Sequence, residues 1–147
     1  MAFKESSKKH LRTCECLINN LDQYNEDSKY VLSNILYLTG YTIETILKYR
    51  LFLNISYARD KAIKDVNQNG ITWNVVKTHD LRNLLRHLRC QENMLIFNDL
   101  QQNNYFKSWD KDYHEIARYE NNNMKNKQKE ILDFFELSKE LFQKMTY

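Results

Sequence analysis

The chain has 147 residues, with two glycines, no proline and a formal net charge of +3 from 22 basic and 19 acidic side chains. This length is enough for one domain with its own core, and the scarcity of glycine and proline excludes folds built from many tight hairpins. The small net charge permits a nucleic-acid partner without requiring one, because binding would have to come from local clusters. We therefore expect a single all-α domain over residues 1–147.

The cysteines and the N-terminus indicate a reduced, cytoplasmic protein. Cys14, Cys16 and Cys90 are odd in number and their spacing fits neither a metal site nor a redox pair, so we expect buried, reduced thiols. The first residues are polar and include no apolar signal segment, so we expect neither secretion nor membrane anchoring. We find no phosphate loop, metal cluster or dinucleotide fingerprint in the sequence, and we expect no cofactor and no metal.

Apolar residues at steps of three and four predict a first amphipathic helix over residues 3–24. Its first half carries many basic side chains, which the helix dipole disfavours at that end. This basic cluster is either a solvated helix end or a patch that faces an anion. Residues 25–28 predict a turn that supplies an N-cap for the next helix.

The stretch at residues 30–53 is apolar on more than one side at helical spacing, which is typical of a helix inside a bundle. Polar residues interrupt it too often for a membrane span. Its small residues predict a surface that a neighbouring backbone can approach closely. These residues are Ser33, Thr39, Gly40 and Thr42.

Beyond residue 53 the pattern indicates at most a short helix before a loop at residues 67–70. Residues 71–76 have β-forming composition, but a single run has no partner strand, so we expect an extended connector held by Trp73. Thr78 is the expected N-cap of a second clear helix over residues 79–89, with a narrow leucine stripe.

The last third predicts three further helices separated by polar segments. A short helix at residues 94–100 precedes a polar linker at 101–107, and Ser108 caps a helix from Trp109 to about Tyr119. Three asparagines then favour a turn before a final helix over residues 125–145. The expected fold is a bundle of about four or five main helices with short accessory helices.

Basic residues of the helix at 79–89 form the first candidate site. Guanidinium groups in such a row can bind phosphates, and the spacing by three and four aligns them along one side of a helix. The alternative is a solvated face paired with acids such as Asp80 and Glu92. The residues in the row are His79, Arg82, Arg86 and Arg89.

A second candidate pair is His114 and Arg118, which lie one helical turn apart beside Trp109 and Tyr113. Such a pair next to aromatic rings can contact a nucleobase. The alternative interpretation is that these side chains line a groove between helices of the bundle.

Three segments give the chain a resemblance to a known family. They are YTIETILK at residues 41–48, THDLRNLL at residues 78–85, and Tyr113 followed by Arg118-Tyr119. In this order they are similar to motifs of the HEPN superfamily, helical bundles named for nucleotide binding in higher eukaryotes and prokaryotes. The resemblance covers about residues 30–145 and implies an up-down bundle that works as a homodimer or beside a nucleotidyltransferase-like partner.

The resemblance implies one of two functions. Many HEPN proteins are metal-independent ribonucleases of toxin or antiviral systems, in which an arginine and a histidine act together across a homodimer. There the 2′-hydroxyl of the RNA attacks the adjacent phosphate, histidine moves the proton and arginine neutralises the developing charge. Other members lack this pair and act as accessory or binding subunits.

Arg82 and His87 have the arginine-to-histidine spacing of the ribonucleases. In active relatives, however, the motif lies where Arg118 falls here, and residues 123–125 include no histidine. Our leading hypothesis is therefore a binding or accessory module for RNA or nucleotides in a prokaryotic defence or toxin-antitoxin type system. The alternatives are a ribonuclease that uses Arg82 and His87 across a dimer, and a bundle that only binds another helical protein through aromatic residues of its central helix.

Overall fold

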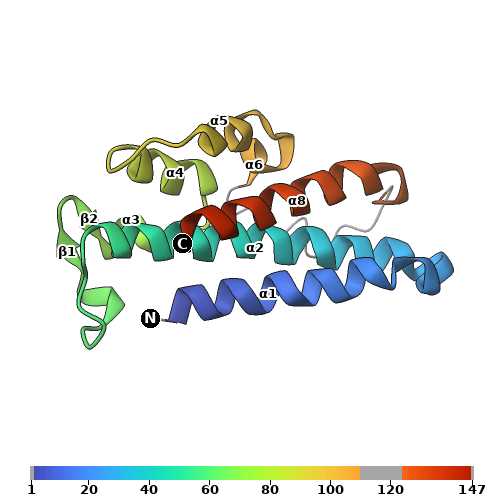
Figure 1. Cartoon of the computed structure of the whole chain (residues 1–147), viewed down its shortest axis with the longest axis horizontal. Coiled ribbons are helices and arrows are strands. Elements are labelled where there is room, and N and C mark those ends of the chain that lie inside the picture. Colours follow the sequence, from blue (N-terminus) through green and yellow to red (C-terminus); the bar gives the residue numbers. More distant parts are fainter. Residues whose placement is uncertain (1, 110–123, 147) are drawn as a thin grey trace.

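The computed structural model describes residues 2–109 and 124–146, and these residues are predominantly helical (Figure 1). The prediction of an all-α fold is confirmed at this level. In the described part of the chain, a two-stranded hairpin is the sheet structure present. No helix in that part combines the length and the apolar character needed to cross a membrane.

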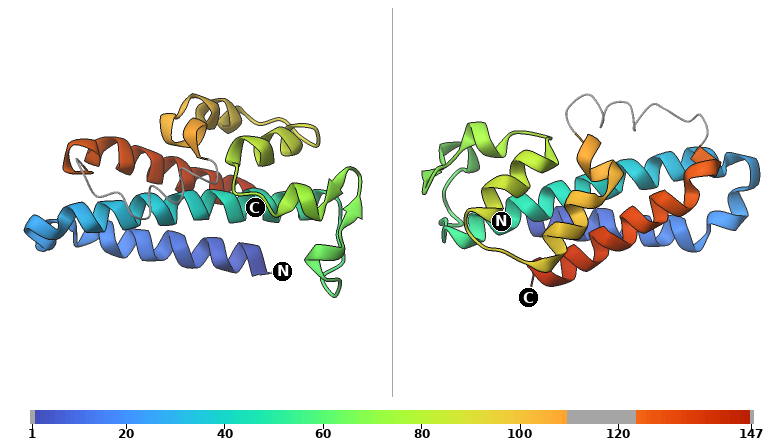
Figure 2. Two further views of the ribbon diagram at one scale, coloured as in Figure 1. Left: turned by 180° about the vertical axis from the view of Figure 1, so that it is seen from behind. Right: turned by 90° about the horizontal axis from the view of Figure 1, so that it is seen from above.

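Helix α2, Ser28–Asn54, is the central element, and it packs against α1, α4 and α8 (Figures 1 and 2). It is buried on more than one side, as the sequence predicts, because apolar side chains cover most of its circumference. The side chains that it places in the core include Leu32, Ile35, Leu36, Ile43, Ile46 and Leu47.

Helix α1, Ala2–Asn19, ends five residues before the predicted boundary at residue 24, and the chain continues as a 3₁₀ helix, Leu21–Asp27. The predicted N-cap at residues 25–28 is wrong in its detail. Asp27 precedes α2, but its backbone is helical and its side chain makes no capping hydrogen bond. A capping side chain normally needs an extended backbone at that position.

The small residues of α2 make room for a side chain as well as for a neighbouring helix. Trp109 is fully buried, and a Cβ placed on Gly40 would lie 1.9 Å from its ring atom Cζ2. On the α1 side, the buried Ser7 hydroxyl donates to the Thr42 carbonyl at 3.0 Å. The close approach is therefore where the sequence predicts it, and an indole ring occupies part of it.

After α2 the chain forms a 3₁₀ helix, Ile63–Asp65, and a hairpin of β1, Asn67–Gln68, with β2, Ile71–Thr72. Asn67 is opposite Thr72 and Gln68 is opposite Ile71. Asn69 and Gly70 close the turn with φ values of 52° and 79°, the left-handed conformations of a two-residue hairpin.

The prediction of a lone extended connector at residues 71–76 is therefore wrong. Its partner strand is formed by polar residues, which apolar patterning does not reveal. Trp73 begins a short helix, α3, Trp73–Val76, and is 42% exposed. The buried side chains of Ile71 and Val76 hold this segment in place of Trp73.

Helix α4, Leu81–Arg89, begins two residues later than predicted, and its N-cap is Asp80 rather than Thr78. The Asp80 carboxylate accepts from the backbone N–H groups of Arg82 and Asn83 at 3.0 and 3.2 Å. The Thr78 hydroxyl accepts from the N–H of Asp80. The predicted leucine stripe is confirmed, with Leu81, Leu84, Leu85 and Leu88 fully buried.

Helix α5, Leu95–Gln102, agrees with the predicted short helix, but the polar linker predicted at 101–107 is wrong. It contains most of α6, Asn104–Ser108, which buries Tyr105 and Phe106. Ser108 ends α6 instead of starting a helix at Trp109, whose backbone is extended. The remainder of the helix predicted there lies outside the described residues.

Helix α8, Gln128–Met145, follows a 3₁₀ helix, Met124–Lys127, and lies along α2 (Figure 2). The predicted inward residues are confirmed except for Phe142, which is half-buried. The buried ones are Ile131, Phe134, Phe135, Leu141 and Met145.

The prediction of buried thiols is correct for one cysteine. Cys14 is fully buried beneath α2, and its Sγ lies 3.8 Å from the Ile35 carbonyl oxygen. Cys16 and Cys90 are exposed. Cys16 follows Cys14 by two positions and so points away from the face that α1 buries.

Candidate functional site

Arg82, Arg86 and Arg89 lie on one side of α4, within about 60° of each other around the helix axis. We call these three residues the arginine face. Arg82 and Arg86 are exposed, and Arg89 is half-buried. The leucine stripe fixes their direction, because the same helix turns its apolar side into the core.

Neutral amides contact the arginine face. Arg86 Nη2 donates to Asn83 Oδ1 at 2.5 Å, and Arg89 Nη2 donates to Asn98 Oδ1 at 2.7 Å. The Arg89 guanidinium also lies 6.0 Å from the centre of the Phe97 ring. Among residues 2–109 and 124–146, no carboxylate forms an ion pair with any of the three arginines.

The acids that could have neutralised the arginine face are engaged elsewhere. Asp80 accepts the backbone N–H groups at the start of α4. Glu92 accepts from Arg50 Nε at 2.8 Å and Arg50 Nη2 at 3.0 Å, and also from the side-chain amide of Asn54. Neither Asp80 nor Glu92 therefore pairs with the arginine face.

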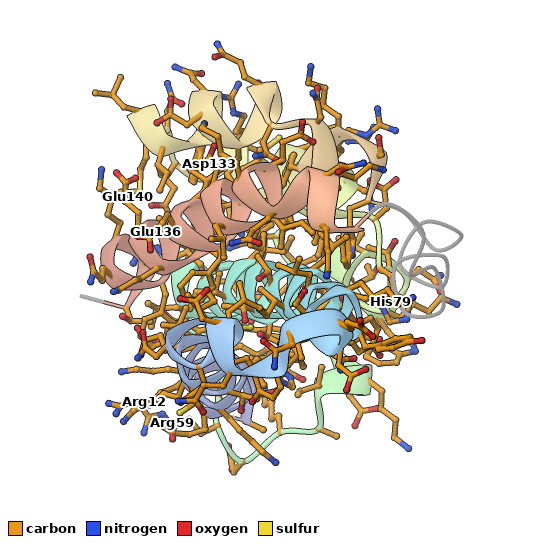
Figure 3. The ribbon with its side chains drawn as sticks, turned by 90° about the vertical axis from the view of Figure 1, so that its right-hand side faces the viewer. Arg12, Arg59, His79, Asp133, Glu136 and Glu140 are labelled. Carbon is orange, nitrogen blue, oxygen red and sulfur yellow. The ribbon has the colours of Figure 1, made fainter. Side chains whose placement is uncertain are left out.

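His79 does not continue the row of arginines, because α4 begins after it. Its Nδ1 lies 3.0 Å from Glu44 Oε2 of α2, and its side chain is 36% exposed (Figure 3). The predicted alignment of His79 with the arginines requires a helix that starts at residue 79. The structure instead places His79 in a separate cluster.

This second group, the Glu44 cluster, consists of His10, Tyr41, Glu44, Lys48 and His79. Glu44 is 3% exposed, and its Oε1 accepts from Lys48 Nζ at 2.7 Å. Burial alone would raise the pKa of Glu44, but the hydrogen bonds and charges of His79 and Lys48 outweigh it, so the net pKa is lowered. The Tyr41 ring contacts the rings of both His10 and His79, with centroid distances of 6.1 and 6.0 Å.

The sequence patterns do not reveal the Glu44 cluster as a unit. The available signal is an acid and a base four residues apart in an otherwise apolar helix, a spacing that allows contact. Burial lowers the pKa of His10, and the nearby charge of Lys9 lowers it further. Because its ionic groups are paired with each other, the cluster can hold α2 against the segment before α4 without a ligand.

Arg82 and His87 are not brought together within one protomer. Arg82 is exposed on the arginine face, whereas His87 lies about 140° away around α4 and is half-buried. A shared centre would need a second protomer, so the catalytic role of this pair stays a prediction. His114 and Arg118 lie outside the described residues.

His87 lines a cavity of about 700 Å³, which we call the His87 cavity. Three parts of the chain form it: the C-terminal end of α2, the tip of the β1–β2 hairpin, and the end of α4 with the loop that follows. Its lining residues are Arg50, Asn54, Ile55, Asn69, Gly70, Ile71, His87, Cys90, Gln91 and Glu92. Burial lowers the pKa of His87, and the charge of Arg86 lowers it further.

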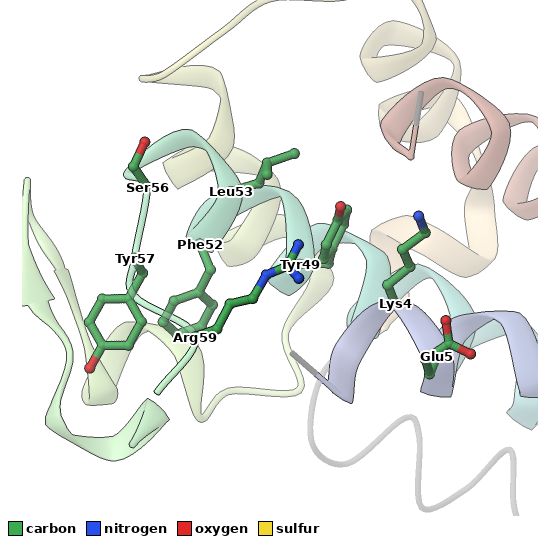
Figure 4. Close-up of a pocket in the computed structure, with 8 residues that line it drawn as sticks. All are labelled: Lys4, Glu5, Tyr49, Phe52, Leu53, Ser56, Tyr57 and Arg59. Atoms are coloured by element: carbon green, nitrogen blue, oxygen red, sulfur yellow. The ribbon is translucent and has the colours of Figure 1, made fainter. Parts of the chain in front are cut away.

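A smaller cavity of about 410 Å³ lies between the start of α1 and the C-terminal end of α2 (Figure 4). Phe52 and Tyr57 form its aromatic wall, with ring centroids 5.2 Å apart. Lys4 and Arg59 supply positive charge at its rim, beside Glu5.

A third surface is acidic and belongs to α8, where Asp133, Glu136 and Glu140 carry the negative charge (Figure 3). Asp133 pairs with Lys129 and Glu140 pairs with Lys144, each four residues away. These side chains lie on a different part of the surface from His79. Asp133 and Glu140 are thus paired within their own helix.

Within the described ranges, no three histidine, cysteine or acidic side chains are grouped so that they could hold a metal ion. No protein-family model, curated protein or solved structure matches this chain.

Proposed function

We propose that this chain is an RNA-binding module of the HEPN type that contacts the RNA backbone through the arginine face. The observation that carries the proposal is a set of three arginines on one side of α4, of which Arg86 and Arg89 contact amides and none pairs with a carboxylate of the described residues. Guanidinium groups stay charged at any physiological pH and match phosphate oxygens in pairs. An arginine surface without acids therefore favours a polyanion.

One contact supports the HEPN part of the proposal. The first two segments that carry the resemblance, residues 41–48 and 78–85, meet in space through Glu44 and His79. The segment with Tyr113 and Arg118 lies outside the described residues. As an accessory module, the chain would work as a homodimer or beside a nucleotidyltransferase-like protein.

Fluorescence anisotropy with a labelled single-stranded RNA of about 20 nucleotides tests the proposal between about 50 and 200 mM salt. The variant carries Arg82→Gln, Arg86→Gln and Arg89→Gln together. Each lost phosphate contact should reduce the slope of log K against log salt by about 0.7. We expect the triple variant to bind at least about tenfold more weakly in low salt.

A matched control removes the same charge from α1, through Lys8→Gln, Lys9→Gln and Arg12→Gln. These side chains are exposed, and α2 lies between α1 and α4 (Figure 1). The control should bind RNA nearly as well as the unmodified protein. Equal losses in both variants would show that net charge, and not the arginine face, determines binding.

The same labelled RNA also tests the two other hypotheses, a ribonuclease and a bundle that binds only another protein. Cleavage in EDTA that disappears in both Arg82→Gln and His87→Gln would favour the ribonuclease. Binding that ignores salt and all arginine variants would favour a protein partner instead. For that last hypothesis, Tyr30 is the aromatic residue of α2 with the clearest exposure, at 47%.

A further inference from the structure

The His87 cavity and the arginine face share helix α4, in which Arg86 directly precedes His87. Around α4, Asn83 lies between Arg86 and His87, at helical angles of about 60° and 40° from them. Arg86 donates to Asn83 Oδ1, so its guanidinium leans toward the side of the helix that carries His87. The effect of Arg86 on the pKa of His87 agrees with this proximity. A phosphate on Arg86 would therefore sit at the edge of the cavity.

The charged groups of the cavity neutralise one another. Arg50 donates twice to Glu92 and once to the Met145 carbonyl oxygen, at 3.1 Å. With this pair closed, the cavity presents amides and an imidazole whose lowered pKa keeps it neutral near pH 7. Such a lining suits an uncharged group with hydrogen-bond donors and acceptors better than it suits a phosphate.

The Gln91 side chain gives separate evidence that a hydrogen-bond partner is missing from this cavity. Its Oε1 accepts from Asn54 Nδ2 at 3.1 Å. Its Nε2 is buried and has no hydrogen-bond partner among the described residues. Buried donors are rarely left unpaired, and a carbonyl oxygen or ring nitrogen of a ligand would satisfy this one after a small rotation of the amide.

The opposite wall of the cavity is preformed. Asn69 and Gly70 are held in the left-handed conformation by the hairpin, and Gln68 Nε2 donates to the Ile55 carbonyl at 2.5 Å. This bond ties the hairpin to the end of α2. A volume of about 700 Å³ is within the range of small-molecule sites and exceeds what one planar ring needs.

We infer that the His87 cavity receives a single unpaired nucleobase of an RNA strand whose phosphates lie on the arginine face. This inference rests on the proposed function and adds a substrate class to it, single-stranded RNA. Bases in a duplex are stacked and paired, so they cannot enter such a cavity. Asn69, His87 and Gln91 would read the edge of the base, and Arg86 would hold its phosphate.

Three labelled RNAs with the same number of phosphates test the inference: a single strand, a duplex, and a single strand with abasic sites in place of bases. The base-bearing single strand should bind at least about tenfold more tightly than the other two. Gln91→Leu and Asn69→Gly should each reduce this difference without changing the salt slope. Asn69→Gly removes the amide but tolerates the positive φ, so it preserves the hairpin.

Gln102→Leu is the control, because it removes an exposed amide from α5 outside the cavity. It should leave all three affinities unchanged. An abasic strand that binds as tightly as the base-bearing strand, with both weakened by the arginine variants, would overturn the cavity inference and keep the proposed function. Absence of any RNA binding would overturn both.

A competition experiment separates a base within a strand from a free nucleotide. Free nucleoside monophosphate at the concentration of the RNA should not displace the strand, because a single phosphate engages only part of the arginine face. Displacement at equal concentration would assign the cavity to a free nucleotide and overturn the inference for a strand.

Discussion

Gly40 lies against the indole of Trp109, so neither side chain can change size without moving the other. Gly40→Ala should lower the free energy of unfolding by about 1–3 kcal/mol, because the added methyl group overpacks the core. This loss should exceed the gain of up to about 1 kcal/mol that alanine brings to a helix interior. Urea denaturation measures the difference.

Two comparisons isolate the cause of that effect. Gly70→Ala meets no atom within 4 Å but requires a side chain at φ +79°, so its cost would come from the backbone alone. In a Trp109→Leu background, Gly40→Ala should cost much less than in the unmodified protein. An undiminished cost in that background would contradict the contact with the indole.

Glu44 is a buried carboxylate that pairs with Lys48 and His79. Glu44→Gln should lower the free energy of unfolding by about 3–5 kcal/mol at neutral pH, because it leaves Lys48 charged and buried. The double variant Glu44→Gln with Lys48→Met should recover much of this loss. No recovery in the double variant would show that burial of the lysine charge is not the cause.

The difference in the free energy of unfolding between the unmodified protein and Glu44→Gln should depend on pH in one direction. The pKa of Glu44 is lowered in the folded state, so the unfolded chain binds the proton first as the pH falls. The stabilisation by Glu44 is complete above the ordinary carboxyl pKa of about 4.3 and is lost as the pH falls through the lowered value. The gap between the unmodified protein and Glu44→Gln should therefore shrink as the pH falls below about 4.3.

At the scale of elements, the stability of α4 depends on the hydrogen bonds that cap its first turn. Asp80→Ala should lower the free energy of unfolding by about 1 kcal/mol, because two backbone N–H groups lose their acceptor. Thr78→Val should cost less, since its hydroxyl accepts a single hydrogen bond outside the helix. Chemical denaturation of both variants measures the two losses in the free energy of unfolding. A larger loss for Thr78→Val would indicate that Thr78 is the N-cap, as expected from the sequence.

Long periodic patterns identified α1, α2, the leucine stripe of α4, and α8, because many residues repeat the same signal. Strands β1 and β2 have two residues each, and α6 has five. Elements this short do not repeat a periodic signal, so their conformations depend on contacts with distant residues. The cap of α4 was misassigned because Thr78 and Asp80 are both capping residues two positions apart. Local sequence does not decide between them.

The same distinction between local patterns and distant contacts applies to the candidate site. The arginine face was predicted because helix geometry alone sets the directions of Arg82, Arg86 and Arg89. The contact between Glu44 and His79 joins residues 35 positions apart. The His87 cavity needs three elements packed together, so neither feature follows from spacing within one helix.

At the scale of the whole molecule, Arg50 connects three parts of the chain. Its guanidinium joins α2 to Glu92 in the loop before α5 and to the Met145 carbonyl at the end of α8. Arg50→Lys should lower the free energy of unfolding by about 1.5–3 kcal/mol, since an ammonium group cannot make the paired bonds to Glu92. Hydrogen exchange should increase at the end of α8 and in the loop around Glu92.

Lys139→Gln provides the comparison for Arg50→Lys. It breaks an ion pair with Glu15 between α8 and α1 whose side chains are 40% and 37% exposed. Such pairs contribute little, so the cost should stay below about 1 kcal/mol. Equal losses in the two variants would mean that Arg50 has no special connecting role.

The unequal exposure of the cysteines makes the protein convenient for chemical labelling. Burial raises the pKa of the Cys14 thiol to about 12, whereas Cys16 and Cys90 are exposed. A thiol reagent should therefore modify two sulfurs quickly and the third only after denaturation, as a time course of absorbance would record. With Cys16→Ser, a fluorophore on Cys90 would stand at the wall of the His87 cavity and report its occupancy directly.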